Sequence, residues 1–209
     1  MKLYSFPGSC ALASHIALEW SGEPYSVEMI SKNDLDQPKF KQLNPSHHVP
    51  ILEGDGWVLD QNAAILTYIA DIAPEAKLDG DGTPLGRAEV NRWLGLINSE
   101  IHPAYKPLFG ATAYLGDQAM IDKSRDNARK QLRNIFERCN TQLGKHAWIA
   151  GDTKSIADPY LFVTVMWSHL VKVDLSGLDH LKKFEQRMRA DAGVKKALKQ
   201  EGLDQAHAA

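Results

Sequence analysis

The chain changes its pattern once, between residues 74 and 83. Before this segment, the chain contains two kinds of run. Runs of strand length are apolar or alternate apolar with polar residues, runs of helix length are amphipathic, and together they follow the order β-α-β-α-β-β-α. After it, the periodic runs have helical spacing. The segment itself, Pro74 to Thr83, is rich in Gly and Asp, as linkers are. We therefore expect an α/β domain followed by an all-helical domain.

The first domain is expected to contain a four-stranded sheet. The expected strands are residues 3–6, 25–30, 49–53 and 57–59, and the expected helices are residues 11–20, 38–43 and 62–72. The first two strands and the helix between them form a β-α-β unit, which predicts parallel and right-handed pairing. Gly54-Asp55-Gly56 joins the last two strands, and such a tight loop predicts an antiparallel hairpin.

The second domain is expected to begin with a helix at Pro84, because Thr83 is a good N-cap and proline is favoured at the first helical position. The expected helices are residues 84–101, 118–143, 155–171, 178–190 and 191–200. At 100° per residue, the first of them carries a small polar stripe of Asn91, Gly95, Asn98 and His102 beside its apolar stripe. Such a stripe suits the wall of a cleft or a subunit contact.

Composition excludes several classes of function. The 24 basic and 26 acidic residues give a net charge of −2, which argues against a nucleic-acid partner bound through a broad basic face. The two cysteines are far apart, and neither has a second cysteine or a histidine at zinc-ligand spacing, so we expect no metal. There is no leader and no apolar run near eighteen residues, so we expect no membrane partner and a cytoplasmic location.

The segment Pro7-Gly8-Ser9-Cys10 places a cysteine at the start of a helix. A helix N-terminus carries unpaired N–H groups and a partial positive charge, which stabilise a thiolate and lower the pKa of a cysteine. Cys10 is therefore a candidate for thiol chemistry, and the alternative is a small buried apolar residue. For Cys139, between Phe136 and Leu143 in a helix, we expect core packing.

Taken in order, these motifs resemble the glutathione transferase family, most closely its bacterial, cysteine-containing beta class. The residues that carry the resemblance are Met1-Lys2-Leu3-Tyr4 with Pro7-Gly8-Ser9-Cys10, Asn44-Pro45, Val49-Pro50, Gln61-Asn62-Ala63-Ala64-Ile65-Leu66, Glu100-Ile101-His102 and Ser155-Ile156-Ala157-Asp158. The resemblance covers essentially the whole chain. It implies a thioredoxin-like α/β domain in residues 1–76, a linker in 77–84 and an all-α domain in 85–209. It also implies a homodimer that takes glutathione as co-substrate.

The resemblance also implies glutathione-binding residues. In the family, the proline of a pair such as Val49-Pro50 is cis and its neighbour's backbone pairs with glutathione; the alternative is a trans proline that starts an edge strand. Gln61 fits the residue that holds the γ-glutamyl end. Asn62 departs from the usual small residue, commonly serine, and the alternative for it is helix capping alone. Lys32 is a candidate for the glycyl carboxylate.

Further candidates surround Cys10. The resemblance implies that His102 lies near the cysteine across the domain interface, where an imidazole would hydrogen-bond or protonate groups at the thiol. The alternative is an interface histidine without a chemical role. Ser9 is a candidate for the hydroxyl that contacts the glutathione sulfur, and Asn98 is a candidate for binding glutathione. For Tyr4 a packed aromatic is the simpler interpretation.

The expected activity is transfer of reduced glutathione to electrophilic, mostly apolar substrates, as in detoxification. Cys10 adds a second route, a mixed disulfide with glutathione that would support thiol exchange or peroxidase chemistry. No second cysteine lies within three residues, which disfavours a dithiol mechanism. The alternatives are a non-catalytic interaction module on the same fold, and a specialised glutathione-dependent isomerase or dehalogenase.

Overall fold

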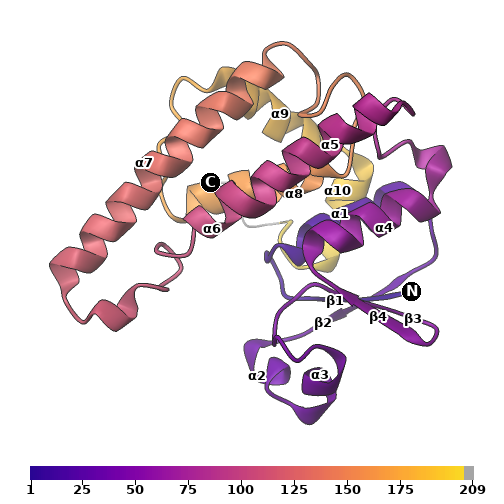
Figure 1. The fold of residues 1–209 in the computed structure, drawn as a ribbon, viewed down its shortest axis with the longest axis horizontal. Coiled ribbons are helices and arrows are strands. Elements are labelled where there is room, and N and C mark those ends of the chain that lie inside the picture. The colour runs from indigo at the N-terminus through magenta and orange to yellow at the C-terminus, as the bar shows by residue number, and fades with distance from the viewer. Residues whose placement is uncertain (205–209) are drawn as a thin grey trace.

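The computed structural model describes residues 1–204, apart from the side chain of Lys32. An α/β domain and a helical domain lie against each other (Figure 1). The strands are β1 (Lys2–Ser5), β2 (Ser26–Met29), β3 (Ile51–Gly54) and β4 (Trp57–Asp60). The helices of the first domain are α1 (Ala11–Ser21), α2 (Lys32–Leu35), α3 (Pro38–Leu43) and α4 (Asn62–Ile72), followed by the 3₁₀ turn η1 (Pro74–Ala76).

The strands form one mixed sheet in the order β2-β1-β3-β4. β1 pairs in parallel with β2, with Leu3 opposite Val27, and antiparallel with β3, with Leu3 opposite Leu52. β3 and β4 form the expected antiparallel hairpin. Helices α1 and α4 cover one face of the sheet, and α2 and α3 lie beyond its opposite side (Figure 1). The prediction of a thioredoxin-like α/β domain followed by helices is confirmed.

Two details of the first domain differ from the prediction. β3 begins at Ile51 instead of residue 49, because Pro50 has no N–H to donate to a strand ladder. The helix α2 was not predicted. It begins with a capping box in which the Ser31 hydroxyl accepts the Asp34 N–H at 3.4 Å and the Asp34 carboxylate accepts the Ser31 N–H at 2.7 Å. The Ser-x-x-Asp spacing is the signal that would have found it.

In the described residues, the regular elements of the second domain are helices. Its elements are α5 (Pro84–Leu96), a π-helical turn (Ile97–Ile101), α6 (His102–Ala104), η3 (Ala113–Leu115), α7 (Gln118–Leu143), α8 (Ala157–Leu170), α9 (Asp179–Ala190) and α10 (Ala192–Gln200). The Thr83 hydroxyl accepts the Gly86 N–H at 3.0 Å, as its predicted capping role requires. The expected long helix to residue 101 instead becomes a π-helix at Ile97, one turn before Pro103. Residues 205–209 of the predicted second domain lie outside the described residues.

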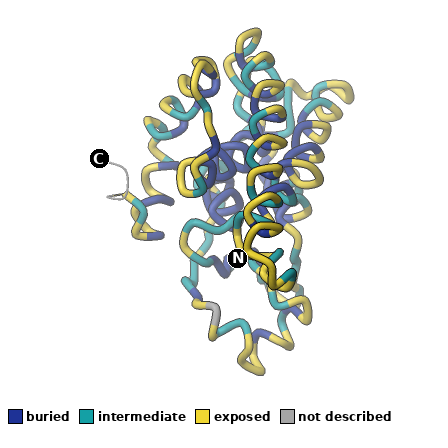
Figure 2. The backbone as a smooth tube through the Cα atoms, turned by 90° about the vertical axis from the view of Figure 1, so that its left-hand side faces the viewer, coloured by how far each residue is buried: buried dark blue, intermediate teal, exposed yellow. Residues whose placement is uncertain are grey.

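Helix α8 forms the centre of the molecule. Its residues from Ala157 to Ser168 are all buried, and the buried segments of the tube gather in the middle of the helical domain (Figure 2). Helix α1 contacts α4 within its own domain and α8 and α10 of the helical domain. The start of α1, where Cys10 lies, is therefore held between the two domains. None of the helices in the described part of the chain is both long and apolar enough to span a bilayer.

Candidate functional site

A tight turn delivers Cys10 to the N-terminus of α1. Gly8 within this turn has a φ of 73°, a left-handed conformation that glycine adopts without steric cost. The indole N–H of Trp167 in α8 donates to the Gly8 carbonyl at 2.8 Å, so the helical domain holds the turn from one side. The Ser9 hydroxyl accepts the Ala11 N–H at 3.3 Å. Ser9 therefore already has a bond at the start of the helix, beside the thiol.

The thiol of Cys10 is half-buried, and its Sγ lies 3.6 Å from the Val49 carbonyl oxygen. Burial raises the pKa of Cys10 to about 12, although the N–H groups of Cys10 and Ala11 point toward the sulfur and act in the opposite direction. The N–H groups of the helix N-terminus therefore act in the expected direction, but the expected net lowering of the Cys10 pKa is wrong. The desolvation of a thiolate outweighs the helix N-terminus, and the thiol is an S–H donor at neutral pH.

This protonated state has a consequence for alkylation. Because only the thiolate reacts, the rate of Cys10 with iodoacetamide is expected to rise about tenfold per pH unit from pH 7 to pH 10, without a plateau. The measurement is best made in a Cys139→Ala background and followed by intact mass. A plateau near pH 8 would show instead that the helix N-terminus dominates.

The Val49–Pro50 peptide bond is cis, as the resemblance implies. The pair stands directly before β3, and the Val49 carbonyl faces the thiol of Cys10. The alternative of a trans proline at the start of an edge strand is wrong. The Val49 backbone therefore lies outside the ladder of β3 and beside the thiol.

Asn62 begins α4 and is 4% exposed. Its Oδ1 accepts the Ser14 hydroxyl at 2.6 Å, whereas its Nδ2 has no partner among the described residues. It makes no capping bond at the start of α4, so the capping alternative is wrong. Gln61, the residue before it, has a φ of 68°. An unpaired buried amide costs about 1–3 kcal/mol, so Asn62 Nδ2 needs an acceptor, and the neighbouring Tyr160 hydroxyl and a bound ligand are the two candidates.

Tyr160 in α8 links these groups to His102. Its hydroxyl lies 2.6 Å from Nδ1 of His102 and 3.3 Å from the Asn98 Oδ1. Burial raises the pKa of Tyr160, the neighbouring Cys10 thiol raises it further, and a contact with Asn62 acts in the opposite direction. Burial also lowers the pKa of His102, and the charge of Lys106 adds to this effect. His102 is therefore neutral at pH 7, in contact through Tyr160 with the groups around the thiol.

Sequence reasoning missed Tyr160, because it stands in an otherwise apolar helical run where a tyrosine is indistinguishable from core. The available signal was its position two residues after Asp158 of the Ser155–Asp158 motif. Tyr4 is 1% exposed and Cys139 is fully buried, so the core interpretation of both is confirmed. The side chain of Lys32 lies outside what the structure describes, and its role stays a prediction.

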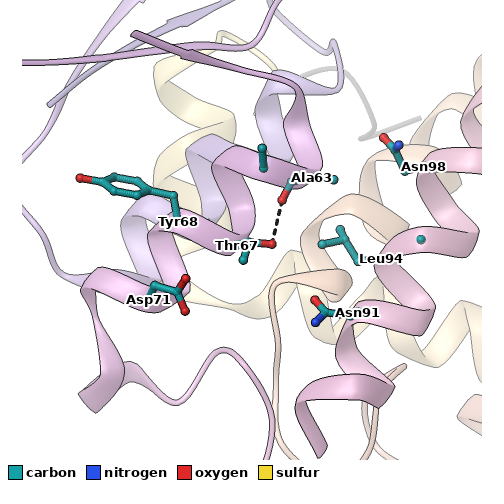
Figure 3. Close-up of a pocket in the computed structure, with 9 residues that line it drawn as sticks. Ala63, Thr67, Tyr68, Asp71, Asn91, Leu94 and Asn98 are labelled. Atoms are coloured by element: carbon teal, nitrogen blue, oxygen red, sulfur yellow. Dashed lines mark hydrogen bonds between the residues drawn. The ribbon is translucent and has the colours of Figure 1, made fainter. Parts of the chain in front are cut away.

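A cavity of about 540 Å³ lies between α4 and the helix α5 with its π-helical continuation (Figure 3). The lining residues are Ala63, Ala64, Thr67, Tyr68, Asp71, Asn91, Leu94, Gly95 and Asn98. Three members of the predicted polar stripe thus line a cleft, as expected. His102 is not among them, because the π-helical turn before it changes the rotation per residue and aims it at Tyr160 instead.

The comparisons with known proteins agree with this geometry. Residues 1–71 match the family model "Glutathione S-transferase, N-terminal domain", and residues 99–191 match "Glutathione S-transferase, C-terminal domain". The chain is 50% identical over 204 residues to glutathione S-transferase GST-4.5 of Xanthomonas campestris pv. campestris, covering 98% of this chain and 100% of that protein.

Two solved structures are similar over nearly the whole chain. A glutathione S-transferase from Xylella fastidiosa has a TM-score of 0.95 at 50% identity, covering 97% of this chain and 98% of the other. The bacterial beta class glutathione S-transferase of Sphingomonas chungbukensis has a TM-score of 0.86 at 36% identity, covering 97% of this chain and 100% of the other. The similarity therefore includes both domains.

Proposed function

The chain belongs to the glutathione S-transferase family, and from this premise we propose that it detoxifies electrophiles by transferring reduced glutathione to apolar compounds. In this reaction the glutathione sulfur forms a bond to carbon, the leaving group departs with its electron pair, and the thiol proton passes to His102 and from there to solvent. One observation carries the proposal. The Cys10 thiol faces the Val49 carbonyl at the start of α1, Asn62 at the start of α4 has an amide nitrogen with no hydrogen bond among the described residues, and Tyr160 lies beside both Cys10 and Asn62.

Glutathione is an extended tripeptide, and the proposed binding site offers a partner for each part of it. The backbone at Val49 would pair with the cysteinyl residue as a strand partner does. The γ-glutamyl carboxylate would lie at the N-terminus of α4, where Asn62 Nδ2 and Gln61 would hold it. The Asn98 Oδ1 accepts the Tyr160 hydroxyl, and this bond connects Asn98 to the proposed binding site. Lys32 is the proposed partner of the glycyl carboxylate.

Thiol activation would come from donors that surround the ligand sulfur. Cys10 keeps its proton at neutral pH, so its S–H is a donor for the glutathione thiolate, as are the nearby N–H groups of the α1 start. Neutral His102 is an acceptor for the proton that glutathione releases. The Ser9 hydroxyl is a further candidate donor to the glutathione sulfur. Each of these donors stabilises the thiolate more than the thiol and so lowers the pKa of bound glutathione.

Cys10 also supports thiol exchange as a side activity. Cys10 would first lose its proton to solvent, and its thiolate would then attack a glutathione-containing disulfide, forming a Cys10–glutathione disulfide and releasing the other sulfur as a thiolate. A second glutathione thiolate would then attack this disulfide, yielding oxidised glutathione and free Cys10. No second protein cysteine is needed, which suits a chain whose other cysteine is fully buried.

The apolar substrate would rest on an aromatic shelf beside His102. Phe109 is 53% exposed, stacks on Tyr105 at 5.5 Å between ring centroids and meets Trp167 edge-on at 5.4 Å. His102 meets the same Trp167 ring at 4.9 Å. An electrophile on this shelf would be adjacent to the proposed sulfur position. Tyr114, 82% exposed, is a further candidate for this surface.

Calorimetric titration of reduced glutathione tests the proposal. We expect one site per subunit, and about 10- to 150-fold weaker binding for Asn62→Ala, since one hydrogen bond to a charged group is lost. Asn127→Ala, an exposed change on α7, is the matched control and should bind as the wild type does. Absence of heat at several temperatures would contradict the proposal and favour the interaction module.

We also propose that the enzyme is a homodimer whose subunits meet at the cavity between α4 and α5. The apolar floor of this cavity contains Ala63, Ala64 and Leu94, and the space beside Gly95 is open, so a second copy can approach closely. Sedimentation should give a species of twice 23.2 kDa. Gly95→Trp, which fills the cavity, is expected to give monomers. Lys123→Trp on the exposed face of α7 should remain dimeric, and a monomeric wild type would contradict the proposal.

A cytoplasmic location follows from the same chemistry. Both Cys10 and Cys139 are free thiols, and the proposed role of Cys10 requires that it stays reduced. Fractionation of cells that express the chain checks this proposal.

A further inference from the structure

A buried carboxylate from the end of the chain reaches the turn that precedes Cys10. Glu201 directly follows α10, and its side chain is wholly inaccessible. One carboxylate oxygen accepts the Ser5 hydroxyl at 2.9 Å and lies 3.0 Å from Nδ1 of His15. The other oxygen accepts the Gly8 backbone N–H at 2.9 Å. All three partners belong to the first domain.

The three partners lie before, within and after the turn. Ser5 is the last residue of β1, Gly8 lies in the turn itself, and His15 lies in α1 five residues after Cys10. The other side of Gly8 is also held from the helical domain, because its carbonyl accepts the Trp167 indole N–H at 2.8 Å. The second domain therefore holds the Gly8 backbone through both a donor and an acceptor.

A glycine turn needs such bonds if it is to keep one conformation. Gly8 has a left-handed φ and no side chain, so its own local interactions restrict it weakly. The buried Glu201 carboxylate accepts hydrogen bonds from the Ser5 hydroxyl and the Gly8 N–H and lies 3.0 Å from Nδ1 of His15, so it cannot move freely. The position of Cys10, two residues after Gly8, follows from this arrangement.

We propose that Glu201 is a positioning residue for the reaction. It fixes the Pro7–Ser9 turn so that the Cys10 S–H and the first N–H groups of α1 remain aimed at the glutathione sulfur. This proposal rests on the proposed function, and it assigns a role in glutathione activation to the segment after α10. Asn62, which we propose holds the γ-glutamyl end, lies on α4, and its Oδ1 accepts the Ser14 hydroxyl.

The test uses Glu201→Gln and Glu201→Leu in the 209-residue chain that carries Cys139→Ala. The readouts are kcat, the KM for glutathione and the pH profile of Cys10 alkylation. We expect kcat to fall by about 10- to 100-fold, as for a misplaced reacting group, while the KM changes less than about threefold. The alkylation rate at pH 8 should rise, because a loosened turn exposes the thiol. Glu185→Gln is the control, since Glu185 pairs with His169 and Arg189 away from the turn.

Folded Glu201 variants with kcat and alkylation rates within about twofold of the wild type would overturn the proposal. If the variants do not fold, hydrogen exchange of the Gly8 amide in the wild type decides. Exchange as slow as that of the buried α1 amides is expected, and exchange at the rate of an open loop would overturn it. Alkylation and hydrogen exchange need no glutathione, so they report on the turn even if transferase activity is absent.

Discussion

Replacing Asp158 by alanine is expected to lower the free energy of unfolding by about 3 kcal/mol at pH 7, because it leaves buried donors without an acceptor. Asp158 is fully buried near the start of α8. Its carboxylate accepts the N–H of Ile149 at 2.9 Å, the N–H of Ser155 at 2.7 Å and the hydroxyl of Ser155 at 2.9 Å. These bonds tie the loop before α8 to the central helix of the molecule.

Denaturant unfolding, followed by circular dichroism, measures the effect. Asp174→Ala is a matched control, because Asp174 also accepts a nearby N–H, that of Ser176, but is exposed. It should destabilise the protein far less. An equal midpoint for wild type and Asp158→Ala would contradict the prediction and show that water satisfies the orphaned donors.

The same residue predicts a pH dependence. Burial raises the pKa of Asp158 to about 6, and the three hydrogen bonds offset this only in part. Because the folded-state pKa lies above the unfolded value of about 3.9, the folded state binds the proton more tightly. The stability difference between wild type and Asp158→Ala is therefore expected to be larger at pH 5 than at pH 7.5. A difference that grows with pH would mean that the hydrogen bonds dominate over burial.

The fold was predictable because its signals are local. Hydrophobic periodicity distinguishes the mixed α/β part from the helical part, and caps such as Thr83 mark helix starts. The π-helical turn before Pro103 was not predictable from periodicity. A proline one turn further along removes an N–H, but whether the chain responds with a kink, an end or a wider turn depends on the packing around it.

Features of the site that depend on sequence order were predictable, whereas features that depend on how deeply a side chain is buried were not. The Val49–Pro50 pair and the helix start at Cys10 follow from sequence order. The pKa of Cys10 depends on how much protein surrounds the thiol, which is a tertiary property. Tyr160 and Glu201 were missed for the same reason, since neither a tyrosine in an apolar helix nor a glutamate near the chain end indicates what it contacts.

Cys10→Ala is expected to abolish thiol exchange while reducing conjugation by only about tenfold. Exchange needs a protein sulfur as nucleophile, and Cys139 is fully buried and cannot replace Cys10. Conjugation uses the sulfur of glutathione, so the variant loses one S–H donor and keeps the N–H groups of the α1 start. The two activities are measured with a glutathione-containing disulfide and with a chromogenic aryl halide.

Cys10→Ser separates the two roles of the residue. A serine hydroxyl is a donor but not a nucleophile for disulfides, so conjugation should recover toward the wild-type rate while exchange stays absent. Cys139→Ala should change neither activity, since its thiol lies in the core. Equal loss of conjugation in the serine and alanine variants would show that the sulfur itself takes part in conjugation. Unchanged rates of both reactions in Cys10→Ala would remove every catalytic role from Cys10 and transfer thiol activation to Ser9, His102 and the helix N-terminus.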